Sequence, residues 1–261
     1  NFKIDNKVKF FFKAGLVALL KEFLFQARMH FNSHYYPINP YKLGIITRER
    51  IKFLRNRNLK RAFEKERGNV NLSSNFIYYA LSFEPERTTN PDGGDFHDQA
   101  IALAKLRELV PANVSIVVKE HPTQFYRIGR GTKGRSPIFY NFLNNIEGVV
   151  LVGDEVDSLE LIRKSIFVAS ISGTVAFESA IMGTPTLIFG DAWYRGCPNI
   201  FTWTSKTTYN KIRDFKCLPP QSIIDFLINQ KNKYGSSFSI KIRFLLSVYF
   251  NSFKLIKSFF V

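Results

Sequence analysis

The residues best suited to chemistry lie between Phe167 and Gly190. In this stretch an apolar run ends in Ser172-Gly173-Thr174, a helical pattern follows, and a Gly-Thr-Pro turn leads into a second apolar run. A helix that begins here offers unpaired N–H groups, two hydroxyls and the positive end of its dipole, which together suit a phosphate. An ordinary strand–helix–strand unit with a polar helix cap gives the same pattern, so the motif alone leaves both interpretations open.

Two neighbours of this turn favour a ligand. Gly173 has no Cβ, so an anion can approach the backbone closely. Glu178 lies one helical turn further on, and we expect it to contact the sugar hydroxyls of the same ligand.

Polar groups also follow two earlier apolar runs. The run 76–83 is followed by Glu84-Pro85-Glu86-Arg87, and the run 114–118 by Lys119-Glu120-His121-Pro122. Ligands of an open parallel sheet lie outside the carboxyl ends of its strands, so we expect these groups to converge with the Ser-Gly-Thr turn. His121 could then neutralise charge on a leaving phosphate as an imidazolium, or donate a proton to it. An ordinary core or surface histidine is the competing interpretation.

The remaining candidates are charged. Glu86 and Glu84 are candidates for a catalytic base or for sugar contacts, with plain turn residues as the alternative, and Lys119 could bind phosphate or form a salt bridge at a strand end. Further cations could meet an acceptor or a carboxylate: Arg87, Arg127 and Arg130. The G-x-G-x-x-G at 129–134 lies about ten residues after its strand and therefore lacks the tight turn of a dinucleotide site. No metal-ligand spacing occurs, and we expect neither a metal nor a cofactor.

The order of elements predicts the fold class. Apolar runs at 76–83, 114–118, 148–152, 167–171 and 186–189 read as strands. Helical patterns alternate with them at 96–109, 137–145, 158–164, 174–182 and 220–231. Five strands separated by helices predict an α/β protein with a doubly wound, parallel, Rossmann-like sheet.

Charge is uneven along the chain. The net charge of the 261 residues is +16, yet residues 71–190 carry slightly more acidic than basic groups and both flanks are basic. A nucleic-acid binder would concentrate its cations around its recognition element. The pattern therefore favours an anionic membrane surface or an acidic acceptor over nucleic acid. Two cysteines without metal or disulfide spacing fit a reducing cytoplasm, and no apolar run is long enough to span a bilayer.

Three regions follow from this pattern. We expect a mostly helical, basic N-terminal segment over 1–75, a nucleotide-sugar-binding domain over 76–232, and a basic apolar C-terminal helix over 233–261. Helical patterns at 7–30 and 47–67 carry the N-terminal cations, and the tail could pack on the protein or lie in a lipid interface.

Several motifs together resemble a known family. The runs YALSFEPERTT, KEHP and SGTVAFESAIMGTPTLIFG, with Trp193-Tyr194, resemble the bacterial capsule polysaccharide biosynthesis family over roughly residues 76–195. The resemblance implies a GT-B glycosyltransferase and the transfer of Kdo from CMP-Kdo. The His-Pro and Ser-Gly-Thr motifs are also similar to those of CMP-sialic acid transferases. That similarity implies phosphate contacts from His121, Ser172 and Thr174, and a donor-sugar or ribose contact from Glu178.

The resemblance leads to a functional expectation. We expect a cytoplasmic glycosyltransferase, peripheral to the inner membrane, that transfers from a nucleotide sugar to a glycan or glycolipid acceptor without a metal. A GT-B enzyme needs a full first domain, and only about 75 residues precede the first strand, so we expect that part to be reduced or truncated. Two alternatives are a UDP-sugar enzyme of the epimerase type and a non-catalytic protein that binds acidic glycans or membranes.

Overall fold

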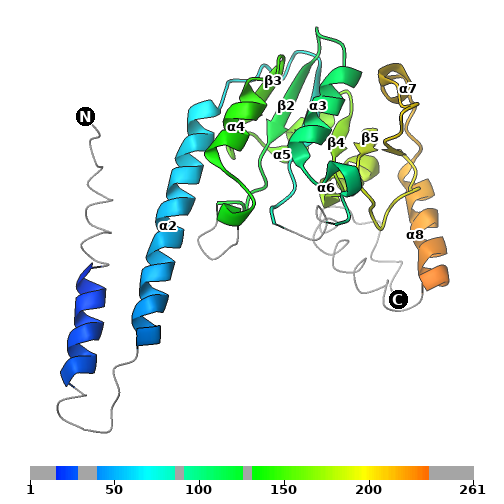
Figure 1. Ribbon diagram of the computed structural model, residues 1–261. Coiled ribbons are helices and arrows are strands. Elements are labelled where there is room, and N and C mark those ends of the chain that lie inside the picture. The colour runs from blue at the N-terminus through cyan, green and yellow to red at the C-terminus, as the bar shows by residue number, and fades with distance from the viewer. Residues whose placement is uncertain (1–15, 29–39, 86–90, 126–130, 235–261) are drawn as a thin grey trace. The chain divides into compact units, whose positions relative to one another are not determined.

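The computed structural model describes residues 16–28, 40–85, 91–125 and 131–234 (Figure 1). The chain forms two compact units. The first comprises Asn1–Arg67, Phe83–Pro85 and His121–Asn144; the second comprises Gly68–Ser82, Glu86–Glu120 and Asn145–Val261. The segment 121–144, which the sequence placed in the nucleotide-sugar domain, thus packs with the N-terminal helices.

The second unit contains one parallel sheet of six strands in the order β3-β2-β1-β4-β5-β6. The strands are β1 (Phe76–Ala80), β2 (Ser115–Lys119), β3 (Val149–Val152), β4 (Val168–Ser170), β5 (Thr186–Ile188) and β6 (Ile200–Thr202). The predicted α/β class and doubly wound sheet are confirmed. The sixth strand, β6, is not among the five that the sequence predicts.

Both faces of the sheet are covered, as the continuous apolar strands require. Every residue of β1 is buried. Phe76 and Tyr78 pack on one face in a cluster with Leu161 of α5 (Ser158–Lys164). Tyr79 faces the other way, and its hydroxyl donates to the carbonyl of Gln99 in α3 (Gln99–Leu109) at 3.1 Å. Helices α3 and α5 therefore lie on opposite faces (Figure 1).

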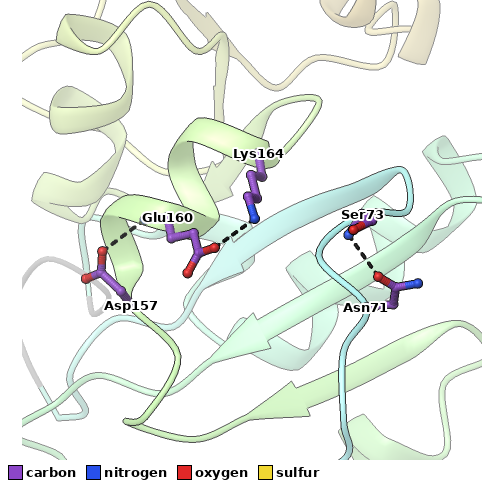
Figure 2. A network of polar contacts seen from close by, with 5 residues as sticks. All are labelled: Asn71, Ser73, Asp157, Glu160 and Lys164. Carbon is purple, nitrogen blue, oxygen red and sulfur yellow. Dashed lines mark hydrogen bonds and ion pairs between the residues drawn. The ribbon is translucent and has the colours of Figure 1, made fainter.

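Local polar contacts set the ends of several elements. The Asp157 carboxylate caps α5 by accepting the Glu160 N–H at 3.1 Å, and Glu160 pairs with Lys164 at 2.8 Å (Figure 2). Asn71 closes a turn in the same way by accepting the Ser73 N–H at 2.9 Å. The remaining helices of this unit are η1 (Gly94–Phe96), α6 (Thr174–Ile181), α7 (Tyr209–Arg213) and α8 (Pro220–Tyr234).

The strand order fixes where a ligand can bind. From β1 the chain builds outward through β2 and β3, and then returns to the other side of β1 to build β4, β5 and β6. The strand order reverses between β1 and β4, and open α/β sheets bind ligands outside the carboxyl ends of the strands at such a switch point. The Ser-Gly-Thr turn follows β4 directly and therefore lies at this switch point.

The first unit is helical. Residues 16–28 form one helix, and α2 (Pro40–Glu66) contacts α4 (Pro137–Asn144) and η2 (Gly131–Lys133). The Phe63 ring lies 5.1 Å from Tyr140 and 5.3 Å from Phe125. The helix predicted at 7–30 is thus confirmed over the described residues 16–28. The helix predicted at 47–67 is confirmed as α2, which begins earlier, at Pro40. Helix α8 ends at Tyr234. The tail helix is predicted over 233–261, and residues 235–261 of it lie outside the described residues. None of the helices in the described segments combines the length and the apolar character that crossing a membrane demands.

Candidate functional site

The switch point of the second unit is rich in hydroxyl groups. Ser170, the last residue of β4, is fully buried, and its hydroxyl donates to the Ala80 carbonyl at the end of β1 at 3.1 Å. A Cβ on Gly173 would lie 3.1 Å from the Ser170 Oγ and 3.6 Å from the Ser82 Oγ. The absence of a side chain at Gly173 thus lets the turn before α6 lie against one serine hydroxyl at the end of β4 and another in the segment after β1.

The start of α6 adds backbone donors to these hydroxyls. Gly173 is the N-cap residue of α6 in an extended conformation, with φ −67° and ψ 154°. Ser172 beside it is 7% exposed, and Thr174 is exposed at the first helical position. The N–H groups of the first turn of a helix have no acceptor within the helix, so this end suits an anion.

A tyrosine from another loop fixes the N-cap. The Tyr194 hydroxyl donates to the Gly173 carbonyl at 2.6 Å. Burial raises the pKa of this phenol, and the negative charge of Glu178 adds to the effect. Tyr194 is therefore protonated, and able to donate, in neutral solution.

The segment that follows β1 is held by a buried glutamine. The Gln99 side chain accepts the Ser82 N–H at 2.7 Å and donates to the Ser82 carbonyl at 3.0 Å. Gln99 is 1% exposed. The position of Ser82 beside Gly173 thus depends on an amide from the first turn of α3.

The neighbouring strand ends are covered. The Asp92 carbonyl accepts the Asp191 N–H at 2.8 Å, and a Cβ on Gly190 would lie 2.9 Å from that carbonyl. The segment before η1 therefore packs over the residues that follow β5.

Lys119 lies at the end of β2 in this unit. Its ammonium donates to the Val156 carbonyl at 2.5 Å and to the Ser158 hydroxyl at 3.0 Å. Desolvation lowers the pKa of Lys119, against the attraction of Asp154 and other nearby carboxylates. Two neutral acceptors, before and at the start of α5, thus bind this ammonium, and both the predicted salt bridge and the predicted phosphate contact stay predictions.

Glu178 is half-buried in the second turn of α6. Its carboxylate contributes to the raised pKa of both Tyr78 and Tyr194, after burial as the main cause. Glu178 thus shares a helix with the Ser172-Gly173-Thr174 turn, and its predicted sugar contact stays a prediction.

His121 belongs to the first unit. Its Nδ1 accepts the Thr123 N–H at 3.3 Å and lies 2.9 Å from the Thr123 hydroxyl. A backbone N–H is always a donor, so Nδ1 serves as an acceptor and the ring proton of the neutral imidazole is on Nε2. The Phe83 ring meets the imidazole edge-on at 5.8 Å. Because Ser172 and Thr174 lie in the second unit, their convergence with His121 stays a prediction.

The other acidic and basic candidates lie either in the first unit or outside the described residues. Glu84 lies in the first unit, where the Gln124 amide binds both its N–H and its carbonyl at 2.9 Å. Four predicted site residues lie outside the described residues: Glu86, Arg87, Arg127 and Arg130. Within the described part of the chain, no three His, Cys, Asp or Glu side chains gather as metal ligands, and metal-independent transfer stays a prediction.

Sequence reasoning missed the residues that support the turn. Ser82, Ser170, Gln99 and Tyr194 come from four separate segments, and no spacing along the chain connects them. The sequence does offer one signal of position, because Ser82 and Ser170 each lie one residue before the end of an apolar run.

Comparisons with known proteins find one matching family and several similar solved structures. A family model described as "Capsule polysaccharide biosynthesis protein" matches residues 15–234. Two solved KpsC structures from Thermosulfurimonas dismutans also match. The beta Kdo 2,7 transferase has 16% sequence identity and a TM-score of 0.41, and the match covers 67% of this chain and 51% of that one. The beta Kdo 2,4 transferase has 15% sequence identity and a TM-score of 0.39, and the match covers 65% of this chain and 53% of that one.

A third solved structure comes from a different class of enzyme. The UDP-GlcNAc 2-epimerase from Neisseria meningitidis, bound to UDP-GlcNAc, matches at 18% identity and TM-score 0.30, over 78% of this chain and 53% of that one. The chain thus spans about half the length of these solved structures. No curated protein sequence matches it.

Proposed function

Because the chain belongs to the capsule polysaccharide biosynthesis family, we propose that it is a glycosyltransferase that transfers a sugar from a nucleotide-activated donor, CMP-Kdo being the expected one. The observation that carries the proposal is the hydroxyl-lined start of α6 at the switch point. The resemblance of the sequence motifs to this family is confirmed by the match over residues 15–234.

The donor phosphate is proposed to bind at the Ser172-Gly173-Thr174 turn. N–H groups at the start of α6 and the hydroxyls of Ser172 and Thr174 would hold its oxygens. Gly173 supports this placement because its missing side chain leaves the turn against the Ser82 and Ser170 hydroxyls. Preorganised donors of this kind stabilise the charge that develops on a departing phosphate.

The transfer needs one bond to break and one to form. An acceptor hydroxyl bonds to the anomeric carbon while the bond from that carbon to the phosphate oxygen breaks, and the nucleotide leaves with the electron pair. The acceptor proton goes to a base, for which Glu86 is the sequence-based candidate. His121 is the candidate donor to the leaving phosphate, and its Nε2–H tautomer supports that role.

A nucleotide screen tests the proposal directly. The thermal unfolding midpoint of the wild-type chain is measured with CMP, UDP and no nucleotide at matched concentrations, since a ligand that binds only the folded state raises it. A rise with CMP but not with UDP supports a CMP-sugar donor, and the reverse supports a UDP-sugar enzyme. No rise with either contradicts the proposal and favours a non-catalytic role in binding acidic glycans or membranes.

We further propose that the protein works in the cytoplasm at an anionic lipid surface, to which the helix 16–28 binds. Large exposed apolar side chains on this helix are Leu16, Val17, Leu20, Phe23, Leu24 and Phe25. Leu16, Leu20 and Leu24 recur every four residues and so share one side, whereas the polar Gln26 is buried. Lys21 and Arg28 are exposed beside the apolar side chains, which suits lipids of negative charge.

Vesicle sedimentation tests this second proposal. The chain should sediment with phosphatidylglycerol vesicles and less with phosphatidylcholine vesicles, and the difference should shrink as salt rises. A Leu20→Glu, Leu24→Glu variant should lose binding. The control is Ile138→Glu, at an apolar residue of α4 that is 79% exposed, and equal binding by both variants would overturn the proposal.

A further inference from the structure

The environment of Tyr194 makes its hydroxyl a fixed donor. The side chain is fully buried in a cluster with Ala176 and Phe177 of α6. Its ring centroid lies 5.9 Å from that of Phe177 and 5.2 Å from that of Trp193. Aromatic contacts on two sides restrict the ring, so the direction of the hydroxyl is set by packing before any ligand binds.

The acceptor of this hydroxyl is the carbonyl that begins α6. The Gly173 carbonyl accepts from Tyr194 at 2.6 Å and also from the Ala176 N–H at 3.1 Å. The peptide bond that follows is planar and trans, so its carbonyl and its N–H point in opposite directions. Holding the Gly173 carbonyl therefore also fixes the direction of the Thr174 N–H, which points away from Tyr194.

We propose that Tyr194 is a positioning residue that orients the peptide between Gly173 and Thr174, so that the Thr174 N–H is presented to the phosphate of a nucleotide. The inference rests on the proposed function, because it assigns the phosphate to this turn. Tyr194 itself does not contact the nucleotide. It acts through the backbone of the turn.

A purely structural role makes a different prediction. Burying a phenol hydroxyl costs free energy unless it finds an acceptor, and the Gly173 carbonyl serves that need in any case. Loss of the hydroxyl would then lower stability and leave ligand preference unchanged. Under the positioning role the loss falls on the phosphate group, while contacts to the nucleoside are kept.

The test compares CMP with cytidine, which lacks the phosphate. Dissociation constants of both are measured by isothermal titration calorimetry for the wild-type chain and for Tyr194→Phe, which removes only the hydroxyl. One hydrogen bond of this kind corresponds to about a tenfold change in affinity. We expect CMP to bind about tenfold more weakly to the variant, with cytidine affinity unchanged. If the thermal unfolding screen shows that the wild-type chain prefers UDP, UMP and uridine replace CMP and cytidine in this comparison.

A matched control removes the same kind of bond at the other edge of the sheet. The Thr184 hydroxyl, at the amino end of β5, donates to the Ile162 carbonyl at 3.1 Å and is buried. Thr184→Val should lower stability without changing the ratio of CMP to cytidine affinity. Replacing Tyr194 with 4-aminophenylalanine, which keeps a donor in the same place, should restore CMP binding.

Three other outcomes would each overturn the positioning role of Tyr194. An unchanged CMP-to-cytidine ratio in Tyr194→Phe would overturn the positioning role and leave the proposed function standing. A Tyr194→Phe chain that fails to fold by circular dichroism would show that the hydroxyl is structural, and would also overturn it. A wild-type chain that binds neither nucleotide would reject the proposed function and this inference together.

Discussion

The Gln99 side chain forms two hydrogen bonds with the backbone of Ser82, at 2.7 Å to its N–H and 3.0 Å to its carbonyl. Gln124 binds Glu84 in the same way within the first unit, at 2.9 Å to both backbone groups. Two residues that follow β1 are thus each fixed by a primary amide, which offers a donor and an acceptor on one rigid plane. An aliphatic side chain in place of either glutamine would leave both backbone groups without this partner.

Gln99→Leu should therefore destabilise the second unit strongly. The substitution keeps a similar volume but removes the partners of two buried backbone groups, each worth about 1–3 kcal/mol when left unsatisfied. We expect the free energy of unfolding to fall by about 2–4 kcal/mol in urea denaturation. Gln221→Leu is the control: Gln221 is exposed, bonds Asp225 at 3.0 Å, and should change stability by less than about 0.5 kcal/mol. Equal losses of unfolding free energy in both variants would contradict a specific contribution from the two Gln99–Ser82 hydrogen bonds.

His121→Ala should cut sugar transfer at least about 100-fold, the low end for a general acid or an electrostatic donor. The fold should persist, because the ring is only partly buried. Turnover is measured with a nucleotide-sugar donor, and folding by circular dichroism. The control is His97→Ala, at an exposed histidine whose Nδ1 lies 3.1 Å from the Gly94 carbonyl. Unchanged turnover in His121→Ala would remove the histidine from the mechanism.

The fold could be predicted well wherever local signals agree. α5 was predicted with the bounds that the structure has, because Asp157 caps its start and an apolar strand follows its end. β6 was missed because Ile200–Thr202 is three residues long and only half-buried, so it has no apolar run to mark it. Such a short edge strand forms because β5 offers it backbone partners, which a local pattern does not contain.

The candidate site was predictable only in part. Ser172, Gly173 and Thr174 are adjacent in sequence, so their position at a helix start could be read directly. Ser82 joins them only through the pairing of β1 with β4, a long-range contact across about 90 residues. His121 follows β2, so the sequence predicted it to be part of the sheet domain. Its assignment to the first unit depends on packing among residues such as Phe125 and Phe63.

The pH dependence of stability should reveal the buried ammonium of Lys119. Burial lowers its pKa below the ordinary 10.5, so the unfolded chain binds this proton more tightly than the folded chain. Stability rises with pH wherever the unfolded state binds more protons. Relative to Lys119→Met, the wild-type chain should therefore gain unfolding free energy as the pH rises toward 10.5.

Urea denaturation at pH 7, 8.5 and 10 measures this trend. Lys105→Met provides the comparison, because the Lys105 ammonium is largely exposed and pairs with Glu108 at 2.7 Å on the surface of α3. That variant should follow the wild-type curve at a constant offset. If the Lys119→Met curve also runs parallel to the wild-type curve, the ammonium is not desolvated in the folded chain.

Gly190→Ala should loosen the cover over the ends of β4 and β5. The new Cβ would lie 2.9 Å from both the Asp92 carbonyl oxygen and the Ile171 Cγ2, and backbone cannot turn aside as a side chain can. We expect a loss of about 1–3 kcal/mol in unfolding free energy, the usual cost of overpacking. Hydrogen exchange at the Asp191 amide, which donates to Asp92 at 2.8 Å, should become faster.

Gly68→Ala separates this steric effect from the general effect of replacing a glycine. Its Cβ would meet only the Val150 Cγ1, at 3.1 Å, and that methyl group can move because it ends a side chain. The substitution also narrows the unfolded ensemble, which favours the folded state by about 0.4–1 kcal/mol. Gly68→Ala should therefore be close to neutral. If Gly190→Ala also left the unfolding free energy unchanged, the segment before η1 would have to move aside readily. The strand ends beside the α6 turn would then be open to a larger ligand.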